Sequence, residues 1–324
     1  MEKHNLISEN QFGFTKGRST TDAIVNLIDM IIQNMEDGKH TLSIFLDLSK
    51  AFDCVDHSIL LEKLESYGIR GVAYSWVKSY LADRSQVVQI SNQFSKANCM
   101  SFGVPQGSIL SPLLFLIYVN DIGSSLELGR LVKYADDTTI CSSSDSIEVL
   151  EIQTFIELNT CFQDFININL KTNTSKSNVI NFSLKYTDCE AGPTVTLSNT
   201  MVEEVYSTKF LGIHLDRGLT WEFHIEHVCS KLSSGIFVLR SLAKYCPTQV
   251  LMMAYYGLIY PHLSYGLTVW GACANTHLIR VFRLQKKAVR IISKLKERES
   301  CKTAFVDLKL LLYKQLYFVC INVP

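Results

Sequence analysis

Two adjacent aspartates, Asp136 and Asp137, constrain the fold more than any other feature of this sequence. They stand between two runs of strand-forming residues, 131–133 and 138–141. A third carboxylate, Asp47, ends another strand-like run, 41–46. If the two strands are neighbours, two of these carboxylates ~5 Å apart repel by roughly 3 kcal/mol at an effective dielectric near 20. Either one carboxylate takes up a proton or a hard cation such as Mg²⁺ lies between them.

Each of these carboxylates also has an ordinary interpretation. A lone Asp-Asp pair is more often a solvated turn than a metal site, and Asp47 by itself fits the end of a strand or a cap. The metal interpretation therefore depends on the sequence around them.

The composition limits the class of protein. The chain has 324 residues, of which 47% are hydrophobic and 19% are charged, enough for a large core in two domains or in one domain with an appendage. The formal net charge is zero, so any affinity for nucleic acid must come from local patches. The ten cysteines form no Cys-x-x-Cys pair, which favours reduced, buried thiols. His224 and His227 lack a further ligand at a matching spacing, so we assign them to an ordinary helix surface rather than to a metal site.

Nothing in the sequence indicates a membrane. No apolar run reaches the ~18 residues that a span requires, and Met1 does not begin a signal peptide. We expect a soluble, intracellular protein without a membrane partner. The sequence does not distinguish the nucleus from the cytoplasm and leaves the oligomeric state open.

Helices and strands alternate through the first two thirds of the chain. The pattern over 19–36 predicts an amphipathic helix, in which Ser19 and Asp22 can form a capping box. Ser111 is the expected N-cap of a helix that has Pro112 in its first turn. Further helices are expected over 58–67, 72–82 and 147–166, and a short strand over 86–90.

The pattern becomes helical after Thr220. Apolar residues from Ile225 to Leu242 mark one long helix, which Pro247 stops, and most of the remaining chain has helical spacing. We therefore predict a boundary near 217–220, with domains at 1–219 and 220–324.

Three motifs carry a resemblance to a known family. They are 47–53 (DLSKAFD), 103–108 (GVPQGS) and 134–137 (YADD), in the order and spacing of reverse transcriptases. Four further runs resemble the fingers motif, the motif after the catalytic hairpin, the primer grip and a run past the thumb: 11–20, 173–182, 210–213 and 284–288. Over nearly its whole length the chain is similar to the reverse transcriptases of non-LTR (LINE-type, jockey-like) retrotransposons.

This resemblance implies an α+β fold. It is the right-hand polymerase palm, an antiparallel sheet backed by helices, with partial fingers and a helical thumb and extension. The implied function is RNA-directed DNA synthesis from a primer 3′ end. The implied partners are an RNA template, a DNA primer and deoxynucleoside triphosphates, and the implied cofactor is a pair of Mg²⁺ ions, with Mn²⁺ as the alternative.

The three carboxylates fit that chemistry. Polynucleotide synthesis is an in-line phosphoryl displacement, in which two divalent ions ~3.5–4 Å apart hold the attacking oxygen, the phosphate and the leaving pyrophosphate. We expect Asp47 and Asp136 to be metal ligands, Asp137 to support them and the carbonyl of Leu48 to add an oxygen. Lys176 is a candidate proton donor to the pyrophosphate, although a solvated lysine explains it equally well.

Four residues are candidate nucleotide contacts by resemblance. Phe52 stands where the family places a side chain beneath the incoming sugar, and its ring would collide with a 2′ hydroxyl; the alternative is a core aromatic that begins the next helix. Gln106 lies in a glycine-flanked loop, whose small neighbours allow close approach of a nucleotide. Lys16 and Arg18 are candidate phosphate contacts.

The last third of the chain contains two further candidate regions. Phe210, Leu211 and Gly212 resemble the primer grip. Between 280 and 314, eleven Lys/Arg stand against three Asp/Glu, and five of these cations fall on one helical stripe beside an apolar stripe. A solvated face is the usual explanation, but here we predict contact with nucleic acid. The five residues are Arg280, Arg283, Lys287, Arg290 and Lys294.

The chain opens only ten residues before Gln11, so we expect part of the triphosphate-binding fingers to be missing and the chain to be a piece of a retrotransposon protein. Two alternatives remain. One is a catalytically silent remnant that binds nucleic acid, and the other is a different palm-type two-metal enzyme such as a nucleotide cyclase. The loop over 103–107 and the helical module beyond residue 220 argue against the cyclase.

Overall fold

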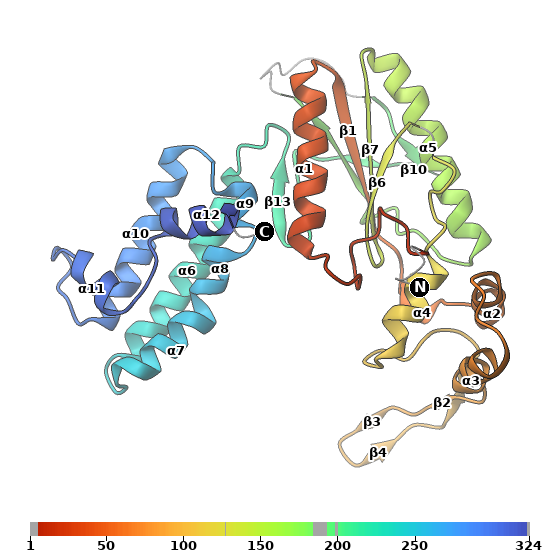
Figure 1. Cartoon of the computed structure of the whole chain (residues 1–324), viewed down its shortest axis with the longest axis horizontal. Coiled ribbons are helices and arrows are strands. Elements are labelled where there is room, and N and C mark those ends of the chain that lie inside the picture. Colours follow the sequence, from red (N-terminus) through yellow and green to blue (C-terminus); the bar gives the residue numbers. More distant parts are fainter. Residues whose placement is uncertain (1–5, 127, 184–192, 198–199, 323–324) are drawn as a thin grey trace. The chain divides into compact units, whose positions relative to one another are not determined.

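The structure is a computed structural model that describes residues 6–126, 128–183, 193–197 and 200–322 (Figure 1). The chain divides into two compact units, Met1–Val205 and Tyr206–Pro324. This division lies ahead of the predicted boundary near 217–220, so the hairpin that contains 207–216 groups with the helices.

A five-stranded sheet forms the centre of the first unit, in the order β11-β8-β1-β7-β6. The central strand β1 pairs antiparallel with both β7 and β8, and β6 pairs antiparallel with β7. The edge strand β11 runs parallel to β8. The predicted α+β fold with an antiparallel sheet is confirmed, apart from this edge. The strands are β1 His40–Leu46, β6 Arg130–Tyr134, β7 Asp137–Ser144, β8 Asn178–Phe182 and β11 Glu203–Glu204.

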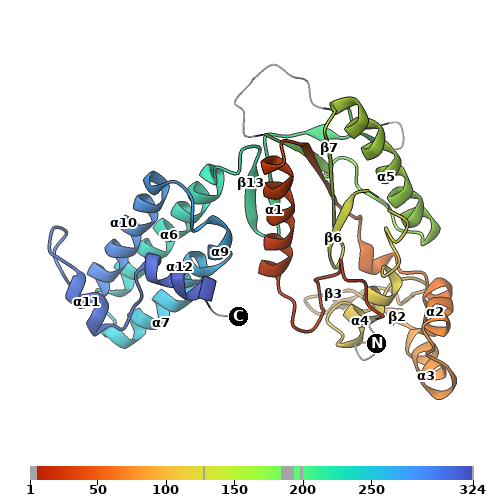
Figure 2. The same ribbon diagram turned by 45° about the horizontal axis from the view of Figure 1, so that its top comes forward.

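Two long helices, α1 Thr20–Glu36 and α5 Ile147–Asn167, lie on opposite faces of this sheet (Figures 1 and 2). Alternate residues of β1, Leu42, Ile44 and Leu46, join a core cluster that includes apolar side chains of α5. Helix α1 begins at the predicted capping box, because Ser19 and Asp22 each accept from the other's backbone N–H. The sheet is therefore covered on both faces, which leaves its strand ends as the places for chemistry.

Shorter elements stand around the lower end of the sheet in Figure 1. A 3₁₀ turn, η2 Ala51–Asp53, and the helices α2 His57–Ser66, α3 Gly71–Leu81 and α4 Leu110–Tyr118 belong to this region. The predicted N-cap of α4 is wrong: Ser111 lies inside the helix, and its hydroxyl donates to the carbonyl of Pro105 at 2.6 Å. Between α3 and α4 an exposed ribbon contains β2 Ser85–Gln86, β3 Gln89–Ile90, β4 Gln93–Phe94 and β5 Asn98–Cys99. A separate small hairpin contains β9 Thr196–Leu197 and β10 Thr200–Met201.

The second unit is mainly helical, as predicted. Helix α6 Glu222–Leu242 packs against α7 Thr248–Leu258 and α10 Asn275–Ile292 and also contacts β13. The other elements are β12 Ser207–Phe210, β13 Ile213–Asp216, α8 Tyr260–Ser264, α9 Leu267–Trp270, α11 Lys302–Asp307 and α12 Tyr313–Asn322.

The assignment of both α6 histidines to an ordinary helix surface is wrong for His224. This side chain is buried, and its ring lies 5.6 Å from that of Trp270. Among the described residues, no group of three or more His, Cys, Asp or Glu side chains is arranged to hold a metal ion. None of the helices in the described part of the chain combines the length and the apolar character that a membrane span requires.

Candidate active site

The adjacent aspartates lie at a two-residue turn between β6 and β7. Tyr134 pairs with Asp137, and Ala135 and Asp136 form the turn itself. Ala135 has φ 57°, a left-handed conformation that costs a residue with a Cβ about 1–2 kcal/mol. A turn of this kind persists only where the surrounding structure holds it in place.

The end of β1 brings Asp47 beside this turn. Leu46 pairs with Thr138, so the residue after Leu46 and the residue before Thr138, Asp47 and Asp137, stand at the same end of the two paired strands. The two strands are therefore neighbours, which is the condition under which the carboxylates at their ends approach one another.

The electrostatics of the turn show that the carboxylates repel one another. Burial raises the pKa of Asp136, and the negative charge of Asp47 adds to the shift. Burial, then Asp136, then Asp47 raise the pKa of Asp137 to about 6. Asp137 is exposed to solvent, which screens part of the repulsion between the carboxylates. Among the groups that shift these two pKa values there is no lysine or arginine, and the site favours an added cation.

The loop after α5 fixes the backbone at Asp47. The N–H of Asn173 donates to the carbonyl of Asp47 at 2.7 Å, and the N–H of Asp47 donates to Oγ of Ser177 at 3.2 Å. The N–H of Ser49 donates to the backbone carbonyl of Lys171 at 2.8 Å. None of these three hydrogen bonds uses the carbonyl oxygen of Leu48. Lys176 is exposed in the same loop.

Gln11 holds the aspartate turn from the other side, and the sequence did not reveal this role. Its side chain is 1% exposed, and Oε1 accepts from the N–H of Gly13 at 2.9 Å and from the N–H of Ala135 at 3.1 Å. A Cβ on Gly13 would lie 2.4 Å from the backbone nitrogen of Ala135, so only glycine permits this approach. The Nε2 of Gln11 is buried without a partner among the described residues. One carboxamide thus fixes the residue that precedes Asp136.

A buried lysine anchors the same hairpin to the end of α4. Lys133 is 1% exposed, and its Nζ donates to the carbonyls of Asn120 and Ile122, each at 3.0 Å. Burial lowers the pKa of Lys133 to about 8. Its backbone also pairs with the N-terminal segment, since the N–H of Phe12 donates to the carbonyl of Lys133 at 2.8 Å. The sequence signal for this buried anchor is a single lysine within an otherwise apolar strand.

The ligands at this site suit a hard divalent cation. Carboxylate and carbonyl oxygens are the ligands that Mg²⁺ prefers, and Mg²⁺ is usually held by one or two carboxylates together with substrate phosphates. Asp47, Asp136 and Asp137 do not form a group of three metal-binding side chains in the described part of the chain, so a bound ion would take further oxygens from water or substrate phosphates. Asp47 and Asp136, with the carbonyl of Leu48, therefore fit the group that the sequence predicts.

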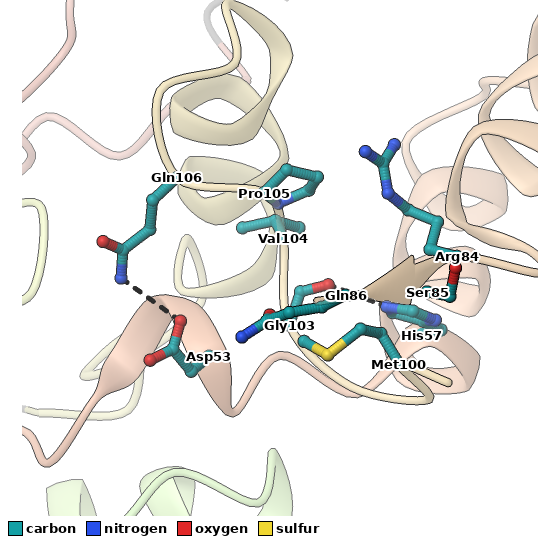
Figure 3. A pocket seen from close by; sticks show the side chains of 10 residues that line it. All are labelled: Asp53, His57, Arg84, Ser85, Gln86, Met100, Gly103, Val104, Pro105 and Gln106. Carbon is teal, nitrogen blue, oxygen red and sulfur yellow. Dashed lines mark hydrogen bonds between the residues drawn. The ribbon is translucent and has the colours of Figure 1, made fainter. Parts of the chain in front are cut away.

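The loop at 103–106 packs against the segment that follows Asp47. The N–H of Val104 donates to the carbonyl of Phe52 at 2.9 Å, and Nε2 of Gln106 donates to Oδ1 of Asp53 at 3.2 Å (Figure 3). Gly103 has φ 88°, and a Cβ there would lie 2.9 Å from the carbonyl oxygen of Asp53. These contacts bring Gln106 close to the turn that carries Phe52.

The ring of Phe52 is half-buried and held by two other aromatic rings. It stacks on Phe115, with ring centroids 4.2 Å apart, and meets the edge of Phe14 at 6.5 Å. The core-aromatic interpretation and the sugar-contact interpretation both fit a ring that is anchored on one side and accessible on the other.

The two predicted phosphate contacts differ in whether their side chains are engaged by other groups of the chain. Lys16 is exposed. Arg18 donates to the carbonyl of Gln11 at 2.9 Å and to that of Glu9, and its guanidinium lies 5.1 Å from the ring of Phe12. Arg18 therefore ties the N-terminal loop together, and its contact with phosphate stays a prediction.

Residues 1–215 match the family described as reverse transcriptase (RNA-dependent DNA polymerase). The chain belongs to the reverse transcriptase family. It is 29% identical over 303 residues to a probable RNA-directed DNA polymerase from transposon BS of Drosophila melanogaster, which covers 90% of this chain and 33% of that protein. It is also 29% identical over 304 residues to the RNA-directed DNA polymerase from the mobile element jockey of Drosophila melanogaster, covering 89% of this chain and 32% of that protein. The chain thus spans about a third of the length of these relatives.

A solved structure supports the fold of this family member. Apo telomerase from Candida tropicalis aligns with a TM-score of 0.51 at 14% identity, over 97% of this chain and 52% of that chain. At this identity the likeness shows the fold alone.

In the second unit, the residues that resemble the primer grip form the β12–β13 hairpin. Phe210 pairs with Ile213, and Leu211 and Gly212 form the turn. The hydroxyl of Tyr265 donates to the carbonyl of Leu211, which ties the turn to the residue after α8. The tip of this hairpin is therefore held by a side chain of the helical part of the same unit.

The predicted basic stripe lies mostly on α10. Arg283 and Lys287 are exposed. Nη2 of Arg280 lies 3.9 Å from Oε1 of Glu226 on α6. Nε of Arg290 donates to the carbonyl of Glu299 at 3.0 Å. The placement of Lys294 on this helix is wrong, because α10 ends at Ile292 and Lys294 has φ 55°. The opposite face of α10 is buried through Leu278, Val281, Gln285, Ala288, Val289 and Ile292.

Proposed function

We propose that this chain extends a primer 3′ end with deoxynucleotides, copies an RNA template and uses two bound divalent ions. The observation that carries the proposal is the convergence of Asp47 with the Asp136–Asp137 turn, at the same end of two paired strands, in a chain of the reverse transcriptase family. The names of its relatives from BS and jockey agree with this activity.

The carboxylates and the lysine have separate roles in this proposal. Asp47, Asp136 and the carbonyl of Leu48 hold the ions, and Asp137 supports them. When bound, Mg²⁺ or Mn²⁺ would activate the primer hydroxyl and neutralise charge on the transferred phosphate. Lys176, exposed in the loop that is bonded to Asp47, would give a proton to the departing pyrophosphate.

Other residues position the substrates. Phe52 would lie beneath the sugar of the incoming nucleotide, Gln106 beside that nucleotide, and Lys16 and Arg18 near its phosphates. Residues 1–219 would serve as partial fingers and palm, and 220–324 as thumb and extension.

Contacts with the nucleic-acid backbone come mainly from the C-terminal region. Phe210, Leu211 and Gly212 would hold the primer end. The basic face of α10 (Arg280, Arg283, Lys287 and Arg290), together with Lys294, would bind phosphates, because clustered cations gain affinity by releasing counterions.

A primer-extension assay with an RNA template tests the proposal. The purified chain should incorporate deoxynucleotides in Mg²⁺ or Mn²⁺, and Asp47→Asn should not. Extension at the wild-type rate by Asp47→Asn protein would refute the site. Primer–template binding without extension in either metal would favour the silent remnant.

A further inference from the structure

Helix α3 carries two aromatic rings in a row, and the segment just after the helix adds a guanidinium. Trp76 is 56% exposed, and its ring lies 6.2 Å from that of Tyr80, with only 20° between the two planes. The guanidinium of Arg84 lies 5.0 Å from the centre of the Tyr80 ring. A spacing of four residues places the two rings on one face of the helix. We call Trp76, Tyr80 and Arg84 the aromatic row.

The aromatic row is attached to the loop of Gln106. The hydroxyl of Tyr80 shares a hydrogen bond of 2.7 Å with Oγ of Ser108, and Nη1 of Arg84 donates to the carbonyl of Tyr80 at 3.3 Å. One end of the aromatic row therefore lies beside the loop that contains Gln106.

A hollow of about 470 Å³ opens where the aromatic row meets this loop. Figure 3 shows Arg84 and His57 on one side of it and Asp53 with Gln106 on the other. Nε2 of His57 is fixed on the carbonyl of Gly103 at 2.8 Å. The hollow thus offers a cation at one edge and groups that can bond a base edge at the other.

The charge around the aromatic row suits phosphate. Between residues 70 and 102 the basic residues are Arg70, Lys78, Arg84 and Lys96, and the one acidic residue is Asp83. This local excess stands out in a chain whose net charge is zero.

Two kinds of partner are to be considered for such a surface. Exposed aromatic side chains also mark protein interfaces, which gather apolar residues around a central anchor. Parallel rings beside a guanidinium and a polar hollow instead match the way single-stranded nucleic acid is held, by stacking of bases and by cations along the backbone.

We propose that the aromatic row is a stacking platform for single-stranded RNA, with the adjoining hollow as a nucleotide pocket. If the chain polymerises as proposed above, this strand is the unpaired template before it enters the active site. Binding itself rests only on the platform and requires neither metal nor nucleotide.

Tryptophan fluorescence tests the contact directly. Trp76 is the exposed tryptophan, whereas Trp221 and Trp270 are 7% and 0% exposed. Short oligouridine should quench the emission of the full chain, and Trp76→Phe should abolish the quenching while retaining the binding. Quenching that persists in Trp76→Phe would overturn the proposal.

An overhang comparison tests the energetics. Fluorescein-labelled RNA hairpins are prepared with and without a single-stranded 5′ overhang, and their affinities are measured by anisotropy. Trp76→Ala should weaken the overhang hairpin roughly fivefold or more and leave the blunt hairpin unchanged. Arg84→Ala should reduce the salt slope for the overhang by up to about 0.7.

A matched control separates stacking from general effects. Val72→Ala removes an exposed apolar side chain one turn before Trp76. This variant should bind the overhang within about twofold of the wild type. Equal binding by Trp76→Ala and wild type, or equal weakening of both hairpins, would overturn the platform. Failure of the chain to extend primers would remove only the proposed function.

Discussion

The aspartate turn in the first unit and the basic face of α10 in the second are built in different ways. The turn depends on bonds from segments far apart in the chain, including Gln11 and Asn120. The cations of this face are carried by one helix, whose opposite face is buried, and three of them, Arg280, Arg283 and Lys287, are exposed. Chemistry on a phosphate requires groups placed to within fractions of an ångström, whereas long-range attraction of phosphates requires only charge density.

This difference predicts how each region responds to substitution. Single changes at the turn should lower the rate and leave binding intact. Changes on α10 should lower the affinity gradually, in proportion to the charge removed.

The largest effect is expected at Asp136. Asp136→Asn keeps the shape but removes a charged ligand, so primer extension should fall by about 10³-fold or more, because metal ions supply several kcal/mol to such reactions. Primer–template affinity should stay within about twofold. Asp145→Asn, an exposed carboxylate after β7, is the control and should extend normally. A rate equal to wild type in Asp136→Asn protein would contradict the assignment.

Gln11→Met should have the next largest effect. It preserves the approximate volume but removes the oxygen that accepts from Gly13 and Ala135, so we expect kcat to fall by about 10–100-fold with little change in the KM for nucleotide. Gln11→Glu retains an acceptor and should recover part of the rate. Gln33→Met, on the exposed side of α1, is the matched control. If activity falls only as much as the amount of folded protein and kcat per folded molecule is unchanged, Gln11 has a purely structural role.

Neutralising the basic face of α10 should weaken binding and not the rate at saturation. The triple variant Arg283→Gln, Lys287→Gln, Arg290→Gln should flatten the plot of log affinity against log salt by up to about 2–3 units if all three contact phosphates. The control removes three exposed cations from α6 and the turn after it, Lys231, Arg240 and Lys244. An equal change of slope in both variants would mean that only total charge matters.

Phe52 should affect the choice of sugar. Phe52→Val shortens the side chain and should raise ribonucleotide use relative to deoxynucleotide use by about tenfold, since lost steric contacts typically change specificity by 10–200-fold. Competition between the two nucleotides in single-turnover extension measures the ratio. Phe102→Val, at an exposed aromatic ring, is the control. An unchanged ratio in an active enzyme would return Phe52 to the core-aromatic interpretation.

The smallest effect concerns stability and lies away from both regions. Burial, with the charges of His214 and His227, lowers the pKa of His224 to about 3. In the unfolded chain this ring takes up a proton near pH 6.5, so its contribution to stability is complete above that pH and is lost as the pH falls from about 6.5 toward 3. Between pH 6.5 and pH 5, His224→Gln should lose about 1–2 kcal/mol less unfolding free energy than wild type in urea titrations. A loss equal to that of the wild type over this pH range would contradict the assignment.

Local signals in the sequence predicted the local structure well. The capping box of Ser19 and Asp22 needs only four consecutive residues, and it starts α1 as expected. The strands that precede Asp47 and begin at Asp137 were recognised by composition, but their pairing is a long-range contact that composition alone does not give.

The residues that hold the turn could not be predicted, because their partners lie far away in the chain. Gln11 bonds to a residue 124 positions later, and nothing near it in sequence indicates that contact. Ser111 was expected to cap α4, but a tertiary bond to Pro105 uses its hydroxyl. His224 was placed on the surface because helical spacing alone does not show which face β13 and Trp270 cover.

The burial of Lys133 gives this hairpin its own chemical reporter. A lysine whose amine is enclosed by backbone carbonyls is shielded from acylating reagents and becomes accessible to them only when the hairpin moves away from those carbonyls. Its labelling rate, read by mass spectrometry, therefore counts how often the hairpin lifts from α4. A substrate that seats the hairpin should slow that labelling before any nucleotide is joined.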